Sequence, residues 1–217
     1  MSNPTANTLS LTDATKAYRL IKSKIISLDY SPGSPINQHE LMAELGVSRT
    51  PIREALKRLE DDSLVVAIHR RGMSVAEIAL NDLRYVYEIR VELEAACARL
   101  AAHRASEAQV HTLEQILDEL LNIDIKEKRL VAECECRLHF LIAESSNSRF
   151  LIKEVQHYYG LALRIWYFLL DRLPPGSEDN DSHILLVKAI KTRDAEMAEQ
   201  LMRTHVKAVF NTVKIYL

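Results

Sequence analysis

The chain contains little glycine, with only five glycines among its 217 residues. It has neither a glycine-rich loop that could cradle phosphates nor a Gly-x-Ser-x-Gly nucleophile elbow, which counts against two large classes of enzyme. Cysteine is also scarce. The chain has an odd number of cysteines, and they lack the spacing of a zinc ribbon: Cys97, Cys134 and Cys136. We therefore expect reduced thiols and a cytoplasmic location.

Long apolar runs are absent as well. No stretch of 18 apolar residues occurs, so we expect no transmembrane helix and no membrane partner. Residues 1–11 lack the cationic start and apolar segment of a signal peptide, and we expect them to form a flexible tail. Apolar residues make up 47% of the chain, which is enough for a packed core, and the length allows one large or two small domains.

Residues 48–60, SRTPIREALKRLE, are the most informative segment that is present. Ser48 or Thr50 can cap a helix that carries Pro51 in its first turn. Cations repeat every fourth residue along one face: Arg49, Arg53 and Lys57. Apolar residues occupy the other face: Ile52, Ala55, Leu56 and Leu59. A short helix with a cationic edge and an apolar back is typical of a reader of the DNA major groove.

The flanking sequence predicts the rest of a winged helix-turn-helix domain over residues 12–76. Helices are expected at 13–28 and 38–45, the second ending at Gly46. Residues 63–67 and 73–78 read as two short strands joined by a tight turn at Gly72. The tip of this hairpin, His69-Arg70-Arg71-Gly72, places cations where a wing would meet phosphates or the minor groove.

Residues 77–217 have a different character, without a strand pattern. Helices are expected at 81–104, 106–128, 130–145, 148–171, 181–192 and 194–216. The fold class is therefore mostly α, with an antiparallel all-α bundle after the winged domain.

Two motifs resemble a known family: HELMAELGVSRTPIREALKRLE and the hairpin HRRGMSV look like the GntR family of bacterial transcription regulators. The helical remainder resembles the ligand-binding (FCD) domain of its FadR-type branch. The resemblance implies that Arg49 and Arg53 contact operator DNA and that Gly72 lies at the groove. His39 stands where many members have a cation or another polar residue, and Ser63 stands where the family usually has glycine.

The predicted DNA-binding residues combine the cationic helix face, the wing and the position before it: Arg49, Thr50, Arg53, His39, Lys57, Arg70, Arg71 and Gly72. One winged helix contacts too few base pairs to specify a single site in a genome. We therefore expect a homodimer on double-stranded operator DNA with a pseudo-palindromic sequence.

A second group of residues lies in the helical part: Glu135, His139, His183 and His205. Glu135 and His139 are four residues apart and share a helix face, and a carboxylate with three imidazoles can hold a divalent metal with open positions. Spacing alone favours ordinary core histidines. The resemblance implies a metal site, because the metal-binding subgroup has an Asp, a His four residues later and two further histidines. Here Glu135 replaces the Asp, and we expect zinc, with nickel or manganese as alternatives.

Arg90 and Arg164 are candidates for binding an effector. An inward-facing arginine can hold a carboxylate with two hydrogen bonds, although each could equally form a salt bridge. We expect a ligand-responsive DNA-binding regulator, a repressor rather than an activator, whose effector is a small carboxylate beside the metal. Two alternatives stay open: a metal-dependent, hydrolase-like enzyme, and a DNA-binding dimer whose pocket is vestigial.

Overall fold

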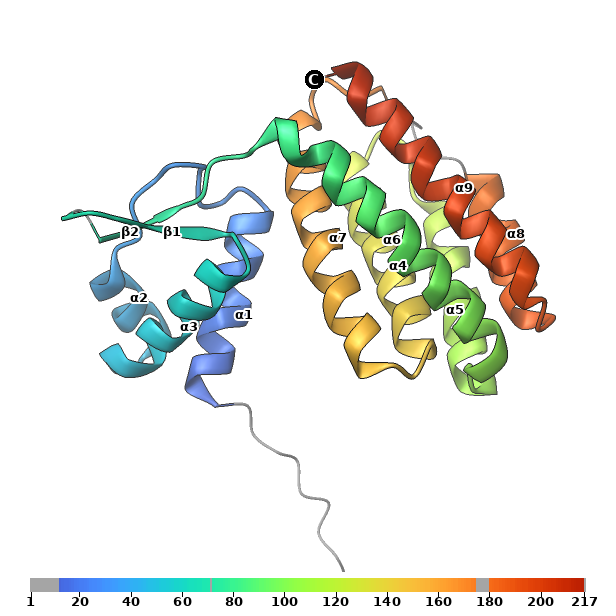
Figure 1. Cartoon of the computed structure of the whole chain (residues 1–217), viewed down its shortest axis with the longest axis horizontal. Coiled ribbons are helices and arrows are strands. Elements are labelled where there is room, and N and C mark those ends of the chain that lie inside the picture. The colour runs from blue at the N-terminus through green and yellow to red at the C-terminus, as the bar shows by residue number, and fades with distance from the viewer. Residues whose placement is uncertain (1–11, 71, 175–179, 217) are drawn as a thin grey trace, which may run out of the picture. The chain divides into compact units, whose positions relative to one another are not determined.

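The computed structural model describes residues 12–70, 72–174 and 180–216 and divides the chain into two compact units between Ile78 and Ala79 (Figure 1). The predicted tail, residues 1–11, and Arg71 lie outside the described residues. Most of the described chain is helical, and the only sheet within it is small and antiparallel, so the predicted fold class is confirmed.

The N-terminal unit is built on three short helices. α1 (Asp13–Ile26) packs against α3 (Arg49–Asp61), which also contacts α2 (Gln38–Leu45). The apolar face predicted for α3 is confirmed, since its four members are buried: Ile52, Ala55, Leu56 and Leu59. α2 ends at Gly46, whose φ of 63° is left-handed and favours glycine. The core of this unit therefore holds one face of α3 inward and leaves the opposite face to solvent.

The wing is the hairpin of β1 (Val65–Ile68) and β2 (Gly72–Val75), with Val65 opposite Val75 and Ile68 opposite Gly72. Both strands are shifted from their predicted ranges, and Gly72 opens β2 instead of forming the turn. The cause lies at the end of α3. The amide of Leu64 bonds to the carbonyl of Leu59 at 2.9 Å, so the chain first closes the helix and strand pairing begins only at Val65.

Ser63 has a φ of 61°, so the backbone there is left-handed although the residue is not glycine. For a residue with a Cβ, this conformation costs roughly 1–2 kcal/mol relative to the right-handed region. The structure thus explains why glycine suits this position, and serine adopts the same turn at that cost.

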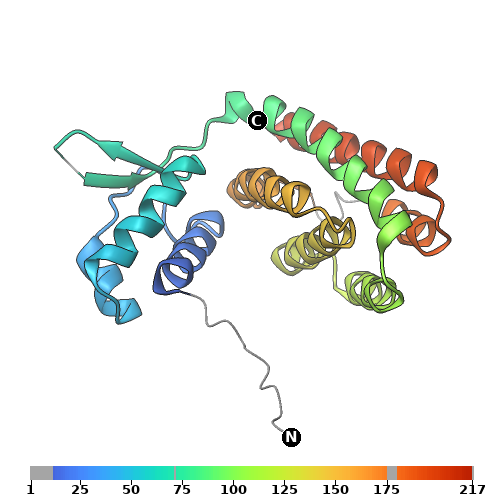
Figure 2. The same ribbon diagram turned by 60° about the horizontal axis from the view of Figure 1, so that its bottom comes forward.

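The C-terminal unit contains six α-helices within the described ranges: α4 (Leu83–Arg104), α5 (Glu107–Asn122), α6 (Lys128–Ser145), α7 (Arg149–Leu169), α8 (Asn180–Lys191) and α9 (Ala195–Val213). Single 3-10 turns, η1 (Leu80–Asp82) and η2 (Lys214–Tyr216), precede and follow them. α4 packs most extensively against α9, and the two run side by side along one face of the bundle (Figure 2). Within the described residues, no helix is both long and apolar enough to cross a membrane.

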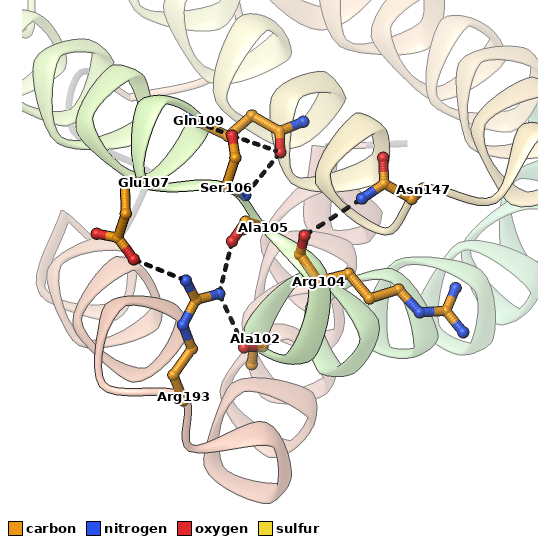
Figure 3. A network of polar contacts seen from close by, with 8 residues as sticks. All are labelled: Ala102, Arg104, Ala105, Ser106, Glu107, Gln109, Asn147 and Arg193. Atoms are coloured by element: carbon orange, nitrogen blue, oxygen red, sulfur yellow. Dashed lines mark hydrogen bonds and ion pairs between the residues drawn. The ribbon is translucent and has the colours of Figure 1, made fainter.

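Three turns at one end of this bundle are held together by polar contacts (Figure 3). Arg193, in the turn before α9, donates to the carbonyls of Ala102 and Ala105 at 3.2 and 2.7 Å, which satisfies carbonyls at the end of α4. Its other terminal nitrogen pairs with Glu107 at 3.0 Å. Asn147, between α6 and α7, donates to the carbonyl of Arg104 at 3.2 Å. These contacts fix α4 relative to α6 and α9, the helices that carry most of the site described next.

Candidate DNA interface and metal centre

The exposed face of α3 presents two cations without partners of their own. Arg49, Thr50 and Arg53 are all exposed, and the guanidiniums of Arg49 and Arg53 make no hydrogen bond or ion pair with any described residue. Since an arginine presents five donors in a fixed fork, these two groups are available for a guanine edge or a phosphate.

Other cations of α3 are already engaged. Lys57 lies 3.0 Å from Glu60 and 3.5 Å from Asp61, so acidic neighbours reduce its local positive potential. Arg58 lies over the ring of Tyr18 on α1, with its Cζ 4.1 Å from the ring centroid. The structure thereby separates Arg49 and Arg53 from Lys57, which the sequence pattern grouped with them.

The remaining predicted DNA contacts lie on α2 and on the wing. His39 is exposed in the first turn of α2, where its amide bonds to the side chain of Asn37 at 3.0 Å. Arg70 is exposed with a φ of 62°, and Gly72 has a φ of 85°. A Cβ at Gly72 would meet nothing within 4 Å, so glycine is favoured there by the backbone conformation and not by crowding.

In the C-terminal unit, three histidines from three different helices converge in the core: His139 of α6, His183 of α8 and His205 of α9. Each offers one nitrogen, and these three atoms lie within 4.8 Å of one another. The ring centroids of His183 and His205 are 4.4 Å apart. Among the described residues this is the only group of three or more potential metal ligands so placed.

Hydrogen bonds orient two of these rings. Nδ1 of His139 lies 2.5 Å from a carboxylate oxygen of Glu94, and Nδ1 of His205 lies 2.9 Å from the hydroxyl of Ser182. In each of these two rings, Nε2 is therefore the nitrogen available to bind a metal. His183 is fully buried, and neither of its ring nitrogens makes a hydrogen bond to a described residue. A buried imidazole with both nitrogens unused fits a metal ligand better than a packing residue.

Burial keeps two imidazoles of the cluster, those of His183 and His205, neutral. Burial lowers the pKa of His183 to about 3, with a smaller contribution from the nearby His139, and burial likewise lowers the pKa of His205 well below its usual value. Burial would raise the pKa of Glu94, but Arg90 and His139 outweigh it and hold that pKa at about 2. Neutral imidazoles are the form that binds metal, so these two rings need release no proton to bind an ion.

Glu135 adjoins the cluster without belonging to its closest group. One of its carboxylate oxygens lies 3.7 Å from Nε2 of His183, which is longer than a hydrogen bond. The His183 ring is neutral at ordinary pH, so charge attraction does not explain this approach. Glu135 nonetheless lines the same cavity as His139 and His205.

The cavity beside the histidines is small, about 30 Å³, and is lined mainly by side chains of α4, α6, α7 and α9: Tyr87, Arg90, Ala132, Glu135, His139, Tyr159, Ala162, Leu163, Trp166, His205 and Val209. Arg90 lies between two aromatic rings, with Cζ 4.9 Å from the centroid of Tyr87 and 4.4 Å from that of Tyr159. Arg164 is also buried, but it is not among the side chains that line this cavity.

Glu94 was not predicted from the sequence, and it links the predicted effector-binding Arg90 to the predicted metal ligand His139. Its carboxylate accepts from Nε of Arg90 at 2.6 Å and contacts His139 with its other oxygen. The predicted salt bridge of Arg90 therefore exists, although Arg90 also lines the cavity. A signal was present, because Glu94 lies four residues after Arg90 on a predicted helix and must share its buried face.

A winged helix whose recognition helix carries cations unpaired within the described residues, followed by an all-α domain with a buried polar cluster, is the architecture of a two-domain DNA-binding regulator. The chain matches the model described as "Bacterial regulatory proteins, gntR family" over residues 13–75 and that of the FCD domain over residues 85–208. The protein therefore belongs to the GntR family of transcription regulators, in the branch with an FCD domain. Members of this family bind operator DNA and are typically dimeric, and the FCD domain is associated with metal binding.

Relatives that match most of the chain are regulators. The chain is 27% identical to the HTH-type transcriptional repressor RspR of Escherichia coli (strain K12), covering 91% of this chain and 87% of that protein. It is 30% identical to the HTH-type transcriptional regulator YdhC of Bacillus subtilis (strain 168), covering 89% and 86%. The family and these relatives are transcription regulators and not enzymes, which decides against the hydrolase-like alternative.

Solved structures support the same fold. McbR/YncC of E. coli aligns with a TM-score of 0.80 at 20% identity, covering 95% of this chain and 97% of that one. A GntR transcriptional regulator of Rhodococcus sp. RHA1 aligns with a TM-score of 0.72 at 21% identity, covering 93% and 97%. At these identities the likeness establishes the fold alone.

Proposed function

We propose that the protein is a metal-dependent, ligand-responsive repressor, in which a small carboxylate bound beside a divalent metal in the FCD domain changes the affinity for operator DNA. The observation that carries this proposal is the buried histidine cluster, and above all His183, neither of whose ring nitrogens makes a hydrogen bond to a described residue. Pure packing does not account for three imidazoles close together inside an apolar bundle, since each buried polar nitrogen needs a partner.

The residues present suit a borderline divalent ion such as zinc, with nickel or manganese as alternatives. His139, His183 and His205 would bind it, and Glu135 would supply a carboxylate oxygen from the cavity wall. When bound, the metal would act as a Lewis acid that holds a carboxylate at its open positions. Arg90, on the same cavity, would direct its terminal nitrogens to that carboxylate while its Nε stays with Glu94.

The protein would act as a cytoplasmic homodimer in which the two units of each chain have different functions. The winged domain, residues 12–76, would bind one half-site of a pseudo-palindromic operator, and residues 77–217 would bind the effector and dimerise. The free guanidiniums of Arg49 and Arg53 support the first part, since nothing in the described chain competes for them. The effector must bind one arrangement of the dimer better than the other, or it cannot shift the affinity for DNA.

The proposal is tested by titrating labelled operator DNA with apo protein, zinc-loaded protein, and zinc-loaded protein with a panel of small carboxylic acids. We expect at least one acid to change the operator affinity 5- to 150-fold, the usual range of allosteric coupling, only when zinc is present. Protein that binds operator but takes up no zinc, and whose stability a chelator leaves unchanged, would instead be a DNA-binding dimer with a vestigial pocket.

Replacing Glu94 with glutamine is expected to lower the affinity for zinc by about 10- to 100-fold, the usual effect of losing a carboxylate that orients a ligating histidine. The E94Q side chain keeps its volume but no longer presents two acceptor oxygens to Arg90 and His139. Glu92→Gln is the matched control, because Glu92 is an exposed glutamate of the same helix that pairs with Arg203. Competition with a chromophoric chelator measures both, and equal zinc affinities for the two variants would exclude an orienting role for Glu94.

A further inference from the structure

The chain contains a single tryptophan, Trp166 of α7, and it lies at the cavity beside the histidine cluster. Only 7% of its surface is exposed, and its indole nitrogen is buried without a hydrogen-bond partner among the described residues. A buried indole N–H usually has an acceptor, so an unused one at the wall of a binding cavity is a donor in place for a ligand.

The cavity wall offers two kinds of group to a ligand, one for a carboxylate and one for a neutral oxygen. A metal held by the histidine cluster, together with Arg90, would provide the positive charge that holds a carboxylate. The indole N–H is a neutral group that donates one hydrogen bond and accepts none, so it adds a place for one further oxygen. The cavity is small, about 30 Å³, which favours a short acid over a sugar acid.

We propose that Trp166 is a specificity-determining residue that donates its indole N–H to the hydroxyl oxygen of a short hydroxycarboxylic acid. This inference rests on the proposed function, because it requires a carboxylate to bind beside the metal. Trp166 then distinguishes a hydroxy acid from the acid that lacks the hydroxyl, since only the former provides an acceptor for the buried N–H.

Glycolate and acetate are the probes, because they differ by one hydroxyl group. Calorimetry of zinc-loaded protein measures the affinity ratio of glycolate to acetate in the wild type, in Trp166→Phe and in Tyr167→Phe. The metal itself can prefer glycolate by binding its hydroxyl, so the change in the ratio is what reports on Trp166. We expect W166F to reduce the ratio about tenfold, the effect of one hydrogen bond, while its zinc affinity stays unchanged. The ratio should stay at the wild-type value in Y167F, because Tyr167 is on the same helix but is not among the cavity-lining side chains.

A second readout needs no variant. Trp166 is the only tryptophan, so the emission of the wild-type protein reports on this position alone. Glycolate should shift the emission of the zinc-loaded protein more than saturating acetate does, and equal shifts would overturn the inference even if W166F failed to fold. A wild-type ratio retained in W166F would also overturn it. Failure of the proposed function looks different, since the wild-type protein would then bind no zinc, or would bind zinc and neither acid nor any other acid of the panel.

Discussion

Replacing His183 with alanine is expected to remove high-affinity metal binding, with a loss of zinc affinity above 100-fold. The ring of His183 lies 4.4 Å from that of His205 and 5.9 Å from that of His139, and neither of its nitrogens makes a hydrogen bond to a described residue. Losing an orienting residue typically costs 10- to 100-fold in metal affinity, so losing a direct ligand should cost more. Metal content after dialysis against limiting zinc measures the effect.

The stability of the protein gives an independent measure of the same change. Zinc at about 100 times its dissociation constant should stabilise the wild-type domain by about 2.7 kcal/mol, and the same zinc concentration should leave the H183A variant unchanged. His183→Asn is a second variant that keeps a polar side chain if alanine disturbs the core. His103→Ala, which changes an exposed histidine of α4, is the control and should bind zinc as the wild type does. An H183A protein that retains wild-type zinc content would eliminate the proposed centre.

Arg53→Ala is expected to weaken binding to the specific operator by about 1–3 kcal/mol for each half-site, which is roughly 5- to 150-fold. Arg53 is exposed on α3, and its guanidinium makes no hydrogen bond or ion pair with a described residue, so its donors are available to DNA. Arg49→Ala should act in the same direction from the first turn of the helix. Fluorescence anisotropy on an operator selected from random DNA with the wild-type protein provides the measurement.

The matched control for this prediction lies on the same helix. Arg58 carries the same charge but lies over the Tyr18 ring of α1, so Arg58→Ala should change operator affinity little and should lower mainly the stability of the domain. If R58A weakens operator binding as strongly as R53A, the effect is general loss of positive charge and not readout by Arg53. Repeating both titrations on random DNA separates the two cases, because phosphate contacts weaken binding on every sequence alike.

The winged domain could be predicted almost entirely from its sequence, because each of its signals is local. The alternation of cations and apolar residues along residues 48–60 determines which face of α3 is buried, and Gly46 marks the end of α2 through its left-handed backbone. The error at the wing was local too. The chain takes a left-handed turn at Ser63 before strand pairing, and serine does not signal such a turn as glycine would.

For the candidate metal centre, the sequence predicted which histidines take part but not how they come together. Resemblance and spacing singled out His139, His183 and His205, but their convergence depends on how α6, α8 and α9 pack. The bond from Glu94 to His139 joins residues 45 positions apart in the chain. Nothing in the sequence near either residue encodes that contact, because it follows from the side-by-side packing of α4 and α6.

By itself, then, the sequence determined the helices, their buried faces and the two guanidiniums of α3, because helical periodicity and capping act over a few neighbouring residues. Only the tertiary structure decided which polar groups meet inside the bundle. It paired Arg90 with Glu94 and oriented His139 and His205 by hydrogen bonds at Nδ1. It left the ring nitrogens of His183 and the indole N–H of the cavity-lining Trp166 without hydrogen-bond partners among the described residues. The presence or absence of a partner is important for these groups because they are buried. A polar group removed from water needs a hydrogen-bond partner in the protein or in a ligand.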